Sequence, residues 1–175
     1  MVDALLVGGV VLTVWAVGLV HQLGHYFAGR RIVGIPAAEL TLVSPLVPRY
    51  VALRDDDEGV PPTEFERYRD VYARHDPEFE HLERFVAGGE IVQTFLLVPA
   101  AIAIALNGFE VVAALVLVAS IGATLVAVGY DAVLTHLSET PSGDYSALWV
   151  VSRRIPVLLL VGFLFVHLGA FYFVA

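Results

Sequence analysis

Two histidines lie four residues apart in the segment His21-Gln22-Leu23-Gly24-His25, near the end of a long apolar run. On an α-helix, this spacing puts both imidazoles on one face, where they can bind the same metal ion. The pattern is that of the HExxH zinc motif, with Gln22 where the motif has glutamate. Polar side chains so deep in an apolar run are costly and usually functional, so the sequence predicts a metal site here. The alternative is that the two imidazoles only hydrogen-bond to their neighbours.

A tetrahedral zinc site needs a third protein ligand and leaves its fourth position open to water. Because the chain has no cysteine, this ligand must be another histidine or a carboxylate. The candidates are Asp131, His136, Glu139 and Asp144. Asp144 is preferred, since a Pro-Ser-Gly turn before it can present its carboxylate beside the helices; the alternative is a turn or N-cap aspartate. Asp131 and His136 are expected to support the ligands or to lie at the membrane interface, and they are the alternative third ligands.

Four apolar runs must position these side chains, at residues 4–28, 91–106, 111–130 and 155–175. Hydrophobic residues make up 58% of the 175-residue chain and charged residues 16%, and the mean hydropathy of +0.76 rules out a water-soluble fold. The first run can cross a hydrocarbon core of about 30 Å, and its flanks are not those of a signal peptide. The second and third runs form a hairpin around Asn107-Gly108. His167, midway along the fourth, is expected to be packed and hydrogen-bonded.

The charged residues predict the orientation of these helices. All ten basic residues are arginines, and they occur only between the first and second runs and just before the fourth. With four crossings, these segments lie on one side of the membrane, which the positive-inside rule makes cytoplasmic. Both termini are then outside, and the zinc site lies toward the cytoplasm. The net charge of −8 argues against a nucleic-acid partner, and the acidic bias without lysine is typical of proteins from high-salt cytoplasms.

The segment between the first two runs has two parts of different character. Residues 34–54 are β-prone and indicate a small hairpin at the membrane surface, broken by Pro36, Pro45 and Pro48. Residues 55–90 are an acidic insert in which residues 55–58 are expected to form a solvated loop. A helix is predicted to start near Pro62-Thr63, with an aromatic face formed by Phe65, Tyr68 and Tyr72.

These patterns predict an all-α integral membrane protein with four transmembrane helices, a small membrane-surface β-segment and an acidic helical cytoplasmic insert. The expected segments are the first membrane helix with the zinc motif at 1–33, the β-prone segment at 34–54, the acidic insert at 55–90, and the other three membrane helices at 91–175 with a second cytoplasmic loop at 131–154.

Four features follow one another along the chain: HQLGHYFAGRR at 21–31, the β-prone segment, the glycine pair after Ala87, and PSGDYSAL at 141–148. In order and spacing they resemble the HExGH helix, the membrane-surface β-segment, the glycine-containing helix start and the aspartate motif of the site-2 protease family of intramembrane zinc metalloproteases. The resemblance implies that His21, His25 and Asp144 bind Zn²⁺. It also implies a membrane-spanning protein substrate, unwound locally within the lipid bilayer.

Gln22 limits the activity that the sequence predicts. In a zinc hydrolase, the glutamate at this position takes a proton from the attacking water, and a glutamine amide cannot titrate. Loss of a general base costs about 10²- to 10⁴-fold in rate, so the protein is expected to be inactive or nearly so. Three explanations of Gln22 stay open: it is an engineered replacement of glutamate, the protein is a naturally inactive family member, or Glu90 acts as a substitute base. The alternative for Glu90 is that it is only a helix-start residue. The rival hypotheses are a noncatalytic zinc-binding membrane scaffold that binds a membrane partner, and a transport component in which His21, His25 and Asp131 relay protons.

Overall fold

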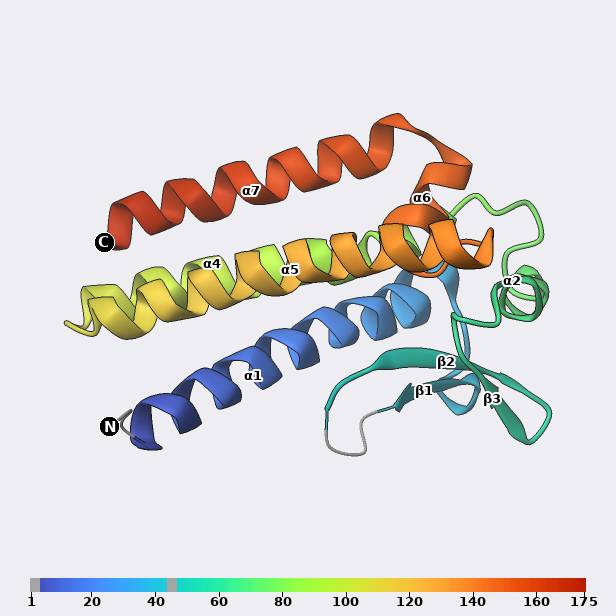
Figure 1. The fold of residues 1–175 in the computed structure, drawn as a ribbon. Helices are drawn as coiled ribbons and strands as arrows, with labels where there is room; N and C mark the ends of the chain where they lie inside the picture. Colours follow the sequence, from blue (N-terminus) through green and yellow to red (C-terminus); the bar gives the residue numbers. More distant parts are fainter. Residues whose placement is uncertain (1–3, 44–46) are drawn as a thin grey trace.

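The computed structural model describes residues 4–43 and 47–175, and long apolar helices make up most of it (Figure 1). Within these ranges, four helices are long and apolar enough to cross a membrane, which confirms the expected number by length and composition. They are α1 (Ala4–Ala28), which continues into the π-helical turn Gly29–Val33, α4 (Gly88–Leu106), α5 (Glu110–Ser138) and α7 (Arg154–Val174). Their outward faces expose valine, leucine and phenylalanine side chains, as a lipid environment requires.

Helix α4 packs against the other three long helices (Figure 1). It approaches α1 closely at Gly24, where a Cβ atom would overlap the carbonyl oxygen of Gly88. Small residues at such crossings let two helix backbones come together in a membrane. At its other end, α4 turns into α5 through Asn107-Gly108, as predicted. The close contact with α1 brings the first turn of α4 beside the two histidines.

A three-stranded antiparallel sheet follows α1 in the described part of the chain, in the order β1-β2-β3. The strands are β1 (Leu40–Val43), β2 (Tyr50–Asp55) and β3 (Glu58–Val60). The β1–β2 hairpin confirms the predicted β-segment, although Pro45 lies outside the described residues. The predicted solvated loop at 55–58 is the turn of the β2–β3 hairpin: Asp56 and Asp57 are exposed turn residues, whereas Asp55 and Glu58 belong to the strands. Asp56 takes a left-handed φ of 53° there, which closes a tight turn that pairs Asp55 with Glu58.

The acidic insert contains two short helices, α2 (Phe65–Ala73) and α3 (Leu82–Val86). The first confirms the helix predicted to start near Pro62-Thr63. Tyr72 of α2 is buried, and its ring centre lies 5.9 Å from that of Phe79 and 5.3 Å from that of Phe85. These aromatic contacts dock the insert on the end of the bundle and place Phe85 next to α1.

Two helix boundaries differ from the predictions. Helix α4 begins at Gly88, so Glu90 belongs to a membrane helix rather than to the insert. Helix α5 continues to Ser138, so Asp131 and His136 lie on a helix and not in a loop at 131–154. The apolar pattern marks only the part of a helix that lies in lipid, whereas backbone hydrogen bonds let the helix continue beyond it. A short helix, α6 (Asp144–Val151), then precedes α7.

Candidate metal centre

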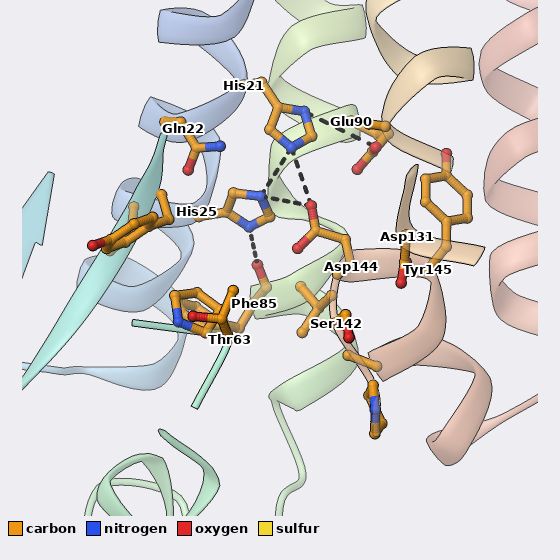
Figure 2. Close-up of a pocket in the computed structure, with 18 of the residues that line it drawn as sticks. His21, Gln22, His25, Thr63, Phe85, Glu90, Asp131, Ser142, Asp144 and Tyr145 are labelled. Atoms are coloured by element: carbon orange, nitrogen blue, oxygen red, sulfur yellow. Dashed lines mark hydrogen bonds and ion pairs between the residues drawn. The ribbon is translucent and has the colours of Figure 1, made fainter. Parts of the chain in front are cut away.

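Three possible ligand atoms meet at one end of the bundle: Nε2 of His21, Nε2 of His25 and Oδ2 of Asp144 (Figure 2). The histidines project from the last two turns of α1, and Asp144 is the first residue of α6. The two nitrogens lie 3.1 Å apart, and the aspartate oxygen lies 3.1 Å from His21 and 3.2 Å from His25. Atoms bound about 2.0–2.1 Å from a tetrahedral ion lie about 3.3 Å from one another. The three atoms could therefore hold a metal ion with its fourth position open.

Hydrogen bonds at the other ring nitrogens orient both imidazoles. Nδ1 of His25 donates to the carbonyl oxygen of Phe85 at 3.1 Å, and Nδ1 of His21 donates to Oε1 of Gln93 at 2.9 Å. A neutral imidazole carries one proton, so both Nε2 atoms are left with lone pairs. Two lone pairs and a carboxylate oxygen thus face one another without a proton between them. This arrangement favours a cation, and it is the pattern of histidines that ligate metals.

Gly89 keeps the space around these atoms open. An ideal Cβ at this position would lie 2.5 Å from Cε1 of His21 and 2.6 Å from Nε2 of both histidines. The backbone of α4 therefore forms one wall of the metal centre, and any side chain at Gly89 would fill it. A glycine directly after Gly88 is therefore needed to keep the space beside both histidines open.

Asp131 positions the candidate third ligand, Asp144, and is not itself part of the ligand cluster. Its buried carboxylate accepts the backbone N–H of Ser146 at 2.8 Å and the Thr135 hydroxyl at 3.0 Å. It thereby ties the first turn of α6 to α5 and fixes the place of Asp144. With the proton of each imidazole on Nδ1, the Asp144 carboxylate faces two nitrogen lone pairs, and a bound cation would stabilise all three candidate ligand atoms.

Glu90 is a carboxylate beside the ligand cluster. Its side chain is 1% exposed, and its Oε1 lies 4.0 Å from Nδ1 of His21. The other oxygen, Oε2, has no hydrogen-bond partner among the described residues. The Tyr145 hydroxyl is also buried without a hydrogen-bond partner among the described residues, and burial, with the charges of Glu90 and Asp144, raises the pKa of this phenol. A buried carboxylate with an unused oxygen is costly unless a bound group makes use of it.

A mainly apolar cavity of about 790 Å³ opens onto the cluster. Gln22 and Glu90 both line it, as do Tyr50 and Val51 of β2. The predicted aromatic face of α2 covers it through Phe65, Tyr68 and Tyr72. The insert is thus a wall of the cavity as well as a solvated surface.

The structure brings His21, His25 and Asp144 together, with Glu90 beside them. It separates two other candidates from the cluster: Asp131 caps α6, and His136 is exposed on α5. Sequence reasoning missed Gln93, whose signal was an isolated amide in the apolar run of α4. Comparisons with models of known families, with curated proteins and with solved structures found no match to this chain.

Proposed function

We propose that the chain is a membrane-embedded zinc metalloprotease, similar to site-2 proteases, in which Glu90 supplies the carboxylate that residue 22 lacks. The observation that carries this proposal is the buried Glu90 side chain, which has an unpartnered Oε2 beside three converging ligand atoms. A general base in a zinc hydrolase must lie near the ligands without being one of them. Glu90 meets this condition from α4, whereas the HExxH motif would meet it from α1.

Each residue of the site has a distinct role in the proposed peptide hydrolysis. His21, His25 and Asp144 would hold Zn²⁺ through two nitrogens and one oxygen. When bound, the ion supplies Lewis acidity for a carbonyl oxygen and for a water molecule. Glu90 takes a proton from the attacking water and passes it to the leaving amine nitrogen as the C–N bond breaks. The Tyr145 hydroxyl, buried and without a hydrogen-bond partner among the described residues, is available to orient an oxygen of the Glu90 carboxylate for both transfers.

The cavity indicates a membrane-spanning substrate in an extended conformation. An intact helix hides its carbonyl groups in backbone hydrogen bonds, so it must unwind before hydrolysis. The cavity lies where the four-helix bundle meets the sheet and insert, and its mainly apolar lining suits side chains drawn from a membrane segment. We propose that the site lies within the bilayer, toward the side that the positive-inside rule makes cytoplasmic.

A noncatalytic zinc-binding scaffold is the second candidate. Gln22 favours it, because the helix that carries both histidines has an amide at the usual position of the base. In such a protein, the same cavity would bind a membrane partner without cleaving it.

Cleavage assays on three purified proteins distinguish the protease from the scaffold. The proteins are the unmodified chain, Glu90→Gln and Gln22→Glu. Each would first be analysed for zinc and then incubated with a panel of single-span membrane substrates. We expect about one zinc per chain in all three, because neither residue is a ligand. We expect the unmodified chain to cleave a substrate and Glu90→Gln to be slower by about 10²- to 10⁴-fold.

Glu110→Gln is the matched control, since it makes the same change in the first turn of α5, at the other end of the bundle. It should leave cleavage unchanged. Activity only in Gln22→Glu would contradict the role of Glu90 and identify Gln22 as the defect. Zinc without cleavage in every variant would favour the scaffold, and a chain without zinc would contradict both candidates.

A further inference from the structure

A chain of buried polar side chains runs from the metal centre through the interior of the membrane bundle. Its members come from all four long helices: His21 of α1, Gln93 of α4, Ser120 of α5 and His167 of α7. Gln93 is 1% exposed, and Ser120 and His167 are fully buried. As expected, His167 is packed and hydrogen-bonded. Polar residues within a membrane bundle are usually functional, yet Ser120 and His167 touch neither a ligand atom nor the cavity.

The donor and acceptor in each hydrogen bond of this polar network follow from the hydrogen bond that His167 makes. Nδ1 of His167 lies 3.0 Å from the carbonyl oxygen of Phe163, which can only accept, so His167 Nδ1 donates. His167 Nε2 must then accept the hydroxyl proton of Ser120, at 2.9 Å. With its proton donated, the Ser120 hydroxyl accepts the amide N–H of Gln93 at 2.8 Å. Each assignment of a donor thus fixes the donor and the acceptor of the next hydrogen bond.

The same links settle the orientation of the Gln93 amide. Its nitrogen also lies 3.4 Å from the backbone carbonyl of Ser120 and 3.3 Å from the Thr124 hydroxyl. Since a carbonyl accepts only, the nitrogen of the amide must point to α5 and its oxygen to His21. That oxygen accepts the proton on Nδ1 of His21, which leaves the Nε2 lone pair directed at the metal centre.

We propose that Ser120 and His167 are positioning residues that hold His21 in its metal-binding tautomer and orientation through Gln93. Partners of a ligating histidine commonly change metal affinity by about 10- to 100-fold when they are removed. This chain extends such support by two residues and connects the docking of α7 to the metal centre. The inference rests on the proposed function only in that the cluster binds zinc.

Zinc affinity tests this inference without any assay of activity. The dissociation constant would be measured by chelator competition in detergent for the unmodified chain, Gln93→Leu, Ser120→Ala and His167→Leu. We expect a loss of about 10- to 100-fold for Gln93→Leu and a smaller loss of the same kind for the two remote variants. Ser120→Thr keeps the hydroxyl and His167→Gln keeps a hydrogen-bond acceptor. Each of these conservative variants should retain most of the zinc affinity of the unmodified chain.

Leu117→Ala is the control for a loss of packing alone, because Leu117 is fully buried on α5 in a separate apolar cluster. It should lower the thermal stability and leave the zinc affinity unchanged. If Ser120→Ala and His167→Leu change the zinc affinity no more than Leu117→Ala does, the two residues only stabilise the bundle and the inference is wrong. Absence of zinc from the unmodified chain would overturn the proposed function and this inference with it.

Discussion

Gly89 shows how a residue without a side chain can specify a site. Alanine at a helical position is ordinarily more stable than glycine by about 0.8–1.0 kcal/mol. At Gly89, however, the added methyl group would overlap the nitrogen atoms of both histidines. The expected effects on helix stability and on metal binding therefore have opposite signs.

We expect Gly89→Ala to lose zinc while the protein stays folded, because the methyl group fills the metal centre. Gly122→Ala is the matched control, since no atom lies within 4 Å of the ideal Cβ at this position on α5. It should keep full zinc content and melt at the same temperature or higher. Zinc per chain and the melting temperature would be measured together. Full zinc content in Gly89→Ala would contradict the role of the α4 backbone as a wall of the metal centre.

At the scale of elements, the insert supports the candidate metal centre through one loop. Asp76 is buried between α2 and α3, where it accepts the Tyr72 hydroxyl at 2.9 Å and the backbone N–H groups of Glu80 and His81 at 3.1 and 2.8 Å. Burial opposes its ionisation, but these hydrogen bonds outweigh burial and lower the pKa of Asp76. The loop leads into α3, where the Phe85 carbonyl accepts from His25.

Acid should therefore loosen the insert. Because the pKa of Asp76 is lower in the folded chain, its hydrogen bonds contribute fully above the unfolded value of about 4 and are lost as the pH falls through the folded value. His81, whose Nδ1 lies 3.7 Å from Asp76, adds attraction when it is protonated. We expect pepsin to cut near Phe79 increasingly as the pH falls from 4 to 2, and Asp76→Asn to be cut already at pH 4. Asp70→Asn, an exposed change on α2, is the control; equal cleavage of both variants at pH 4 would contradict this role of Asp76.

At the scale of the whole molecule, the two ends of the bundle differ in kind. The sheet, the insert and the α5–α6 connection lie at one end, whereas the start of α1, the end of α7 and the α4–α5 turn lie at the other (Figure 1). All ten arginines lie between the end of α1 and the start of α4 or at the start of α7. With the long helices in a bilayer, the positive-inside rule predicts that the end with the sheet and the insert is cytoplasmic, and we propose this orientation.

Single cysteines test this orientation without background, because the chain has none. We expect Asp56→Cys and Ser142→Cys to react with an impermeant maleimide from the cytoplasmic side and Asn107→Cys to react from the outside. Labelling would be compared in intact cells and in inverted membrane vesicles. Labelling of Asn107→Cys and Asp56→Cys from the same side would contradict four crossings.

Patterns along the chain were enough to predict four features of the structure: the membrane helices, the β1–β2 hairpin, the α2 helix and the pairing of His21 with His25. Each of these depends on residues close in sequence, through hydropathy over a span, through turn residues or through the i, i+4 spacing of a helix. The sequence also singled out Asp144 and Glu90, but it left other interpretations of each open.

The folded chain was needed for the rest of the candidate site. Asp144 is 123 residues from His21, and its place depends on the Asp131 cap that ties α6 to α5. Glu90 reaches the cluster because two glycines let α4 approach α1, and Gln93 meets Ser120 only where α4 and α5 pack. The spacing of residue types within one helix cannot predict such contacts, because they depend on which faces of separate helices meet and how closely their backbones pack.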